Sequence, residues 1–168
     1  MGIGGTAAPG RPEAVVLCGI QGSGKTTFYG AQFSATHARI NLDELKTRHR
    51  EREALLTCLE AGRSFVVDNT NPTAAERAVY AQPALAHGFR LVAFWIEALP
   101  REAIVRNALR QGRERIQVPG ILGTYKRLEV PSLAEGFDAV FRVRSENGER
   151  FLVEPLEALP DRVPSRRP

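Results

Sequence analysis

A spacing of glycine, lysine and threonine that binds phosphate follows the first apolar run of the chain. The pattern G-x-x-x-x-G-K-[ST] is filled by Gly19, Gly24, Lys25 and Thr26. Such a loop folds its backbone N–H groups around phosphate oxygens, and the helix that follows presents its positive N-terminal end to the same anion. The apolar run at 14–18 supplies the strand that must precede the loop, so the sequence predicts a P-loop.

A P-loop implies a nucleoside triphosphate and Mg²⁺, and the residue types assign the contacts. Lys25 adds a mobile positive charge for the β- and γ-phosphates of ATP, and the Thr26 hydroxyl is placed to ligate the Mg²⁺ that bridges them. We expect the nucleotide to be held by Gly19, Gln21, Gly22, Ser23, Gly24, Lys25, Thr26 and Thr27.

An aspartate, Asp43, follows the second predicted strand, at 38–41. Because ligands bind at the carboxyl ends of parallel strands, this carboxylate is expected near the γ-phosphate, where it can accept the proton of an attacking hydroxyl. A structural alternative is equally compatible with the spacing. In it, Asn41 or Asp43 caps the next helix and Glu44 complements the helix dipole.

A second aspartate, Asp68, ends the apolar run at 64–67. An Asp at the end of a strand next to the P-loop can hold Mg²⁺ directly or through water. The alternative is a turn without a metal, and in either case Asn71 is predicted to cap a helix that Pro72 starts.

Arginines are concentrated in one segment of fifteen residues, in which only Glu102 and Glu114 are acidic. These arginines are Arg101, Arg106, Arg110, Arg113 and Arg115. Arg106 and Arg110 are four residues apart on a predicted helix, and like charges at this spacing destabilise a helix unless an anion meets them. Phosphates in transfer would be such an anion. The alternative is a solvated basic face in which Glu102 pairs with Arg106. The polar stretch at 111–119 that follows is typical of a mobile lid.

Strand-like and helical patterns alternate along the chain, which predicts an α/β P-loop NTPase fold. We expect a parallel sheet of about five strands with helices on both faces, an Arg-rich lid and an antiparallel edge hairpin turning at Asn147-Gly148. Strands are predicted at 14–18, 38–41, 64–67, 89–96, 138–143 and 150–153. Helices are predicted from Lys25, from the second strand to Ala61, from Pro72, from Pro100 and over 121–128.

The 168 residues suit one globular domain, predicted at 14–154, with a disordered leader at 1–13 and a flexible tail at 155–168. No apolar run approaches the length of a membrane span, so we expect no membrane partner and a cytoplasmic location. Cys18 and Cys58 are expected in the core, and the three histidines lack zinc-ligand spacing. Of the net charge of +4, the residues from Asp161 onward contribute +2, so the body is nearly balanced.

Taken together, these segments resemble the kinase domain of the phage-type 5′-hydroxyl polynucleotide kinases and the small P-loop kinases related to them. The motifs that carry the resemblance are GIQGSGKTT at 19–27, INLDELK at 40–46, VVDNTNP at 66–72, RNALRQG at 106–112, VPGIL at 118–122 and EGFDAV at 135–140. The resemblance implies transfer of the γ-phosphate to an alcohol. Asp43 would be the general base, Lys25 and Thr26 the phosphate and Mg²⁺ contacts, and Arg106 and Arg110 the lid arginines.

One position departs from that family pattern. Where the polynucleotide kinases carry an arginine that helps to hold the acceptor's phosphate, this chain has Lys46, which keeps the charge but loses the bidentate fork. The best single expectation for the acceptor is a 5′-hydroxyl end of RNA or DNA. The alternatives are a small-molecule kinase acting on a sugar, nucleoside, antibiotic or metabolite, a nucleotide-binding regulatory module, and a toxin that phosphorylates a nucleotide sugar.

Overall fold

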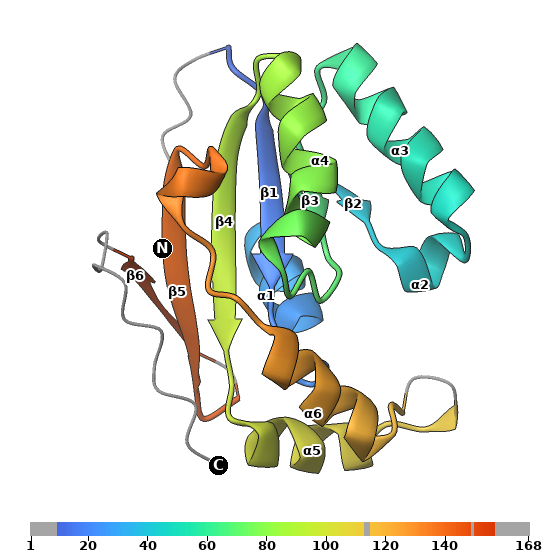
Figure 1. Ribbon diagram of the computed structural model, residues 1–168, viewed down its shortest axis with the longest axis vertical. Helices are drawn as coiled ribbons and strands as arrows, with labels where there is room; N and C mark the ends of the chain where they lie inside the picture. The colour runs from blue at the N-terminus through green and yellow to red at the C-terminus, as the bar shows by residue number, and fades with distance from the viewer. Residues whose placement is uncertain (1–9, 113–114, 149, 157–168) are drawn as a thin grey trace.

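The computed structural model describes residues 10–112, 115–148 and 150–156 (Figure 1). Within these residues one sheet has the strand order β2-β3-β1-β4-β5-β6. Its strands are β1 (Glu13–Cys18), β2 (Ala38–Ile40), β3 (Phe65–Val67), β4 (Arg90–Glu97), β5 (Ala139–Glu146) and β6 (Arg150–Pro155). The helices are α1 (Lys25–Gln32), α2 (Leu42–Leu45), α3 (Arg48–Ala61), α4 (Ala74–Ala86), α5 (Pro100–Ala108) and α6 (Val118–Arg127), with a short 3-10 helix, η2 (Leu133–Glu135).

Strands β2, β3, β1, β4 and β5 pair in parallel, and β6 pairs antiparallel with β5. The predicted α/β class, the parallel sheet and the edge hairpin are therefore confirmed. The hairpin turns at Asn147 and Gly148, whose φ angles are 53° and 78°. Two consecutive positive φ angles are what a type I′ turn requires, and Asn-Gly adopts them at low cost.

Helices cover both faces of the sheet, because side chains of successive strand residues point to opposite sides. On one face Val16 packs with residues of α3 and α4, including Leu55 and Ala84. On the other face Val15 packs with Phe28 of α1. Figure 1 shows α3 and α4 in front of the sheet and α1 behind it. Strands β1 and β4 point downward in this view, so their carboxyl ends face α5 and α6, whereas α2 follows the end of β2 on the right.

The predicted helix up to Ala61 is wrong in one respect, because the structure divides it into α2 and α3. Lys46 has a φ angle of 71°, a left-handed conformation that a helix interior does not allow. The side chain of Thr47 then accepts a hydrogen bond from the backbone N–H of Arg50 and so caps a new helix. Gly62 ends α3 with a φ angle of 61°, as predicted. The break leaves Asp43 on a separate short helix at the edge of the sheet.

The predicted start of the next helix is also wrong. Thr73 caps α4, and its partner Glu76 completes a capping box with it. Pro72 therefore precedes the helix and does not begin it. Asn71 has a φ angle of 43°, and its side-chain amide donates to the carbonyl of Leu17, 2.8 Å away. Asn71 thus ties the loop after β3 to β1 and caps no helix.

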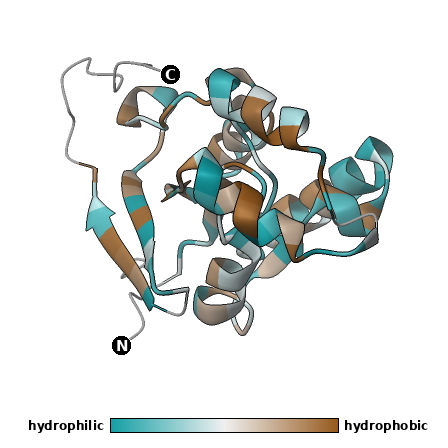
Figure 2. Cartoon of the chain, turned by 90° about the horizontal axis from the view of Figure 1, so that it is seen from below, coloured by the Kyte–Doolittle hydropathy of each residue, from teal (hydrophilic) through white to brown (hydrophobic). Residues whose placement is uncertain are grey.

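The first strand begins one residue earlier than predicted, at Glu13, and the last strand ends two residues later than predicted, at Pro155. Residues 1–9 and 157–168, which include most of the predicted leader and tail, lie outside the described residues. Cys18 and Cys58 are free and buried, as expected. None of the helices described here has the length and hydropathy to cross a lipid bilayer. In Figure 2, which views the molecule from the end where α5 and α6 lie, the helices nearest the viewer carry both hydrophobic and hydrophilic residues.

Candidate functional site

The P-loop joins β1 to α1 at the carboxyl edge of the sheet. Lys25 turns back over the loop, and its ammonium donates to the carbonyl oxygens of Gly19 and Ile20, 2.9 and 2.8 Å away. Gly24 precedes α1 with a φ angle of 103°, a conformation that glycine adopts without strain. The loop therefore places a lysine cation and the N-terminus of α1 next to each other, which is a phosphate-binding arrangement.

Helices α5 and α6 support this loop from the side. A Cβ atom on Gly22 would lie 2.6 Å from the carbonyl oxygen of Ala103, so the loop and α5 approach as closely as glycine permits. Arg106 donates to the carbonyl oxygens of Gly22 and Ser23, each 3.3 Å away. Arg106, one arginine of the Arg-rich segment, thus lies against the P-loop.

Two side chains complete this support. The side-chain amide of Gln21 donates to Thr124 of α6, 3.1 Å away. Asn107 of α5 exchanges two hydrogen bonds with the backbone of Ile116, at 2.6 and 2.8 Å, and so closes the loop between the two helices. The alternative pairing of Glu102 with Arg106 does not form among the described residues, because Glu102 accepts from the N–H of Leu99 instead.

Two oxygen ligands suited to Mg²⁺ meet beside the loop. The Thr26 hydroxyl lies 3.4 Å from a carboxylate oxygen of Asp68. Asp68 follows β3, which pairs directly with β1, and it is only 2% exposed. Within the described part of the chain no three His, Cys, Asp or Glu side chains are close enough to hold a metal ion together. A Mg²⁺ ion fits this donor set, because Mg²⁺ takes one or two protein oxygens and completes its shell with phosphates and water.

An arginine that the sequence did not single out also binds these oxygens. Arg39 of β2 donates to one oxygen of Asp68 through Nε and Nη2, at 2.9 and 2.6 Å, and Nη2 lies 3.2 Å from the Thr26 hydroxyl. Its other nitrogen, Nη1, pairs with Glu44, and its guanidinium lies over the ring of Tyr29, 5.3 Å from the centroid. The strand order β2-β3-β1 brings these residues together, and no local sequence pattern signals it.

The short helix α2, which carries Asp43, lies next to this group, because Glu44 of α2 pairs with Arg39. Asn41 is the N-cap, because its side chain accepts from the N–H of Glu44 at 3.1 Å, so Asp43 is not needed as a cap. The amide of Asn41 donates to the carbonyl of Asp68 at 2.6 Å, which fixes α2 to the end of β3. Asp43 itself is exposed, as is Lys46, which ends α2.

The pKa of Lys25 depends on burial and on several nearby charges. Burial of the ammonium lowers the pKa of Lys25 to about 8 from its ordinary value near 10.5. The negative charges of Asp68 and Asp43 act in the opposite direction and raise this pKa, whereas the positive charge of Arg110 lowers it. Asp43, Asp68 and Arg110 therefore all lie close enough to Lys25 for their charges to act on its ammonium. Arg113 lies outside the described residues, and Thr27 is exposed.

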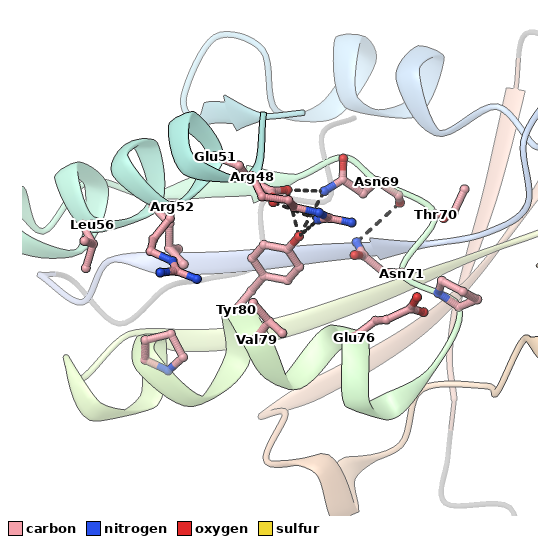
Figure 3. Close-up of a pocket in the computed structure, with 13 residues that line it drawn as sticks. Arg48, Glu51, Arg52, Leu56, Asn69, Thr70, Asn71, Glu76, Val79 and Tyr80 are labelled. Carbon is pink, nitrogen blue, oxygen red and sulfur yellow. Dashed lines mark hydrogen bonds and ion pairs between the residues drawn. The ribbon is translucent and has the colours of Figure 1, made fainter. Parts of the chain in front are cut away.

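A cavity of about 410 Å³ opens on the other side of the loop after β3, between α3 and α4 (Figure 3). This volume lies within the usual range of small-molecule sites. The end next to the loop is polar and contains Arg48, Glu51, Asn69 and Tyr80. The rest of the lining is mixed, because the charged Arg52 lies beside Leu56 (Figure 3). The apolar lining residues are Leu55, Leu56, Val79 and Pro83.

The polar residues of the cavity form one hydrogen-bonded cluster, in which they point toward each other (Figure 3). Glu51 is 4% exposed and accepts from Asn69 at 2.7 Å and from the Tyr80 hydroxyl at 2.8 Å. Arg48 donates to the second Glu51 oxygen at 2.8 Å. Burial, and next the hydrogen bond to Glu51, raises the pKa of Tyr80 to about 12.

This cluster also reaches α2. The side-chain oxygen of Asn69 accepts from the N–H of Leu42 at 2.9 Å, so the residue that Glu51 orients holds the first turn of the helix that carries Asp43. The prediction from sequence did not identify Glu51 and Tyr80, because these two residues meet only when α3 and α4 pack side by side. Only Asn69 carried a signal, since it lies in the D-N-T-N-P segment.

A P-loop between the first strand and the first helix of a parallel sheet, with helices on both faces, defines the P-loop NTPase class, and the comparisons agree with it. A family model described as an AAA domain matches residues 46–122, less than half of the chain. The bifunctional polynucleotide phosphatase/kinase of Schizosaccharomyces pombe is 33% identical over 137 residues, which are 78% of this chain and 33% of that protein. The chain thus spans about a third of the length of this relative.

Solved structures are similar in fold at lower identity. A chain from the PezAT chromosomal toxin-antitoxin system of Streptococcus pneumoniae has a TM-score of 0.62 at 16% identity, over 89% of this chain and 74% of that one. A gluconokinase from Sinorhizobium meliloti has a TM-score of 0.55 at 18% identity, over 79% of this chain and 82% of that one. These structures share the fold of the chain, and the sequence similarity supports a phosphotransferase that resembles polynucleotide kinases.

Proposed function

We propose that this protein transfers the γ-phosphate of ATP, with Mg²⁺, to a hydroxyl group, and that the acceptor is the 5′-hydroxyl end of RNA or DNA. The observation that carries the proposal is that Asn41 fixes α2, the helix of Asp43, to the end of β3, where Asp68 lies 3.4 Å from the Thr26 hydroxyl of the P-loop. A hydrolytic switch needs a positioned water and moving loops. A carboxylate held beside the phosphate site on its own short helix suits a hydroxyl nucleophile instead.

Each group in the site has a proposed part in the transfer. The P-loop and Lys25 bind the phosphates, and Thr26 and Asp68 would hold Mg²⁺, which supplies charge neutralisation between the β- and γ-phosphates. The acceptor oxygen forms a bond to the γ-phosphorus while the bond to the β–γ bridging oxygen breaks, and the hydroxyl proton passes to Asp43. Arg106 and Arg110 would stabilise the charge on the transferring group. The contact of Arg106 with the P-loop carbonyls supports this role.

The proposed acceptor side is the cavity between α3 and α4. Its polar end adjoins the loop after β3, and two exposed cations of α3, Arg48 and Arg52, line it. Such cations can bind the phosphates of an oligonucleotide, and Lys46 adds a further positive charge at the end of α2. The name of the Schizosaccharomyces pombe relative favours a polynucleotide acceptor. We place the protein in the cytoplasm as part of the same proposal.

A small-molecule acceptor is the second candidate, favoured by the size of the cavity and by the fold shared with the gluconokinase. Salt dependence separates the two. A polynucleotide acceptor binds with an affinity that falls steeply as salt rises, because bound cations are released from its phosphates, and a small neutral acceptor does not.

The test is phosphate transfer from γ-labelled ATP with Mg²⁺ to a 5′-hydroxyl oligonucleotide, beside the same oligonucleotide already 5′-phosphorylated. We expect label on the 5′-hydroxyl strand only. Asp43→Asn should lower kcat by about a hundredfold or more and leave nucleotide affinity within about twofold, the pattern of a lost transition-state contact. Glu60→Gln, an exposed acid on α3, is the matched control. Label on neither strand, with ATP still bound, would move the assignment to a small-molecule acceptor.

A further inference from the structure

Arg39 and the proposed Mg²⁺ ion require the same two oxygen atoms. Nη2 of Arg39 lies 2.6 Å from Oδ2 of Asp68 and 3.2 Å from Oγ1 of Thr26, and these two oxygens are themselves 3.4 Å apart. A Mg²⁺ ion would bind its ligands at about 2.0–2.1 Å. A guanidinium nitrogen that bridges the two oxygens therefore occupies the place the ion needs.

The carboxylate that Arg39 neutralises is almost fully buried, at 2% exposure. A buried carboxylate needs a compensating positive charge, and either an arginine or a metal ion can supply it. When both cations approach the same oxygen, their repulsion adds to the steric conflict. Binding of the metal through Oδ2 of Asp68 and the present position of Arg39 are thus mutually exclusive.

Arg39 has a second set of contacts to which it can move. Its Nη1 already pairs with Glu44 on α2, a carboxylate whose side chain is 58% exposed, and its guanidinium lies 5.3 Å from the centroid of the Tyr29 ring. A carboxylate and an aromatic face together are a favourable environment for a guanidinium. Neither of these contacts involves Asp68, so both are compatible with release of that carboxylate.

We propose that Arg39 is an internal cation that competes with Mg²⁺ for Asp68 and Thr26, so that the metal binds well only together with a nucleotide. The proposal rests on the proposed function, because it uses the same metal site. The phosphates of the nucleotide add oxygen ligands, which increase the affinity of the site for the metal so that the metal displaces Arg39. Movement of Arg39 toward Glu44 also connects occupation of the metal site with α2, the helix that carries Asp43.

The test is binding of Mn²⁺, a spectroscopic substitute for Mg²⁺, to the full chain without nucleotide, measured by the electron paramagnetic resonance signal of free Mn²⁺. We expect Arg39→Gln to bind Mn²⁺ on the order of tenfold more tightly than the wild type, because a negative coupling of ordinary size is removed. Arg39→Lys, which keeps a charge but loses the fork, should lie between the two. Arg50→Gln, an exposed arginine of α3, is the control and should leave Mn²⁺ affinity unchanged.

Thermal unfolding gives an independent readout. Arg39→Gln should lower the Tm in EDTA, because Asp68 loses its partner, and Mg²⁺ alone should restore more of the Tm in this variant than in the wild type. Unchanged or weaker Mn²⁺ binding by folded Arg39→Gln and Arg39→Lys proteins would overturn the proposal and make Arg39 a support for Asp68. A failure of the proposed function is distinguishable, because the wild-type transfer assay does not depend on Mn²⁺ binding without nucleotide.

Discussion

The depressed pKa of Lys25 makes nucleotide binding a proton-coupled event near pH 8. With a pKa of about 8 in the protein, Lys25 is about one quarter protonated at pH 8.5. Phosphates of a bound nucleotide stabilise the ammonium and raise this pKa again, so binding at pH 8.5 should take up about 0.7 of a proton. At pH 6.5 Lys25 is already protonated, and its uptake should be close to zero.

The lowered pKa of Lys25 also makes the free energy of unfolding depend on pH. The pKa in the folded protein lies below its ordinary value near 10.5, so the unfolded chain binds more protons between about pH 8 and pH 10.5. Within that window, the contribution of Lys25 to stability rises with pH, whereas the contribution of its charge to nucleotide affinity falls. Binding and stability should therefore respond to pH in opposite directions at this residue.

Proton uptake is measured by isothermal titration calorimetry of a Mg²⁺-saturated, non-hydrolysable ATP analogue, in buffers of different ionisation enthalpy. The slope of the observed enthalpy against the ionisation enthalpy gives the number of protons taken up. Lys25→Arg is the control, because arginine remains protonated at both pH values and should show no uptake. An uptake near zero at pH 8.5 in the wild type would refute the reasoning, since Lys25 would then have its ordinary pKa.

Two further predictions concern the packing around the site. Gly22→Ala places a methyl group about 2.6 Å from the carbonyl oxygen of Ala103, at a residue whose φ angle of 78° strains any side chain. Nucleotide affinity should therefore fall roughly tenfold. Gly30→Ala, where the added methyl group meets open space, should bind nucleotide normally in the same titration. Arg77 of α4 is fully buried and donates to Glu135 and to the carbonyl oxygens of Asn71 and Pro72 in the loop after β3. Arg77→Met removes these bonds and should lower the free energy of unfolding by about 3–5 kcal/mol in urea titrations. An unchanged midpoint would show that the loop after β3 does not depend on this arginine.

The P-loop could be predicted from the sequence because its parts are neighbours in the chain. The strand, the loop at 19–26 and the helix N-terminus are joined by a few residues, so local spacing determines their geometry. The same reasoning explains the edge hairpin, whose Asn147-Gly148 turn is a local signal. Where two local signals competed, the prediction was wrong. The cap of Thr47 began a new helix after Lys46, and Thr73 with Glu76 displaced the predicted cap at Asn71.

The sequence by itself determined the nucleotide loop, the α/β class and the carboxylates that follow two of the strands. Only the tertiary structure decided which cation lies on Asp68 and what holds α2 in place. Arg39 meets Asp68 across 29 residues of sequence, and Asn69 meets Glu51 across 18. Contacts of this kind depend on the order of parallel strands and on the packing of α3 against α4, and no periodicity within a single segment encodes either.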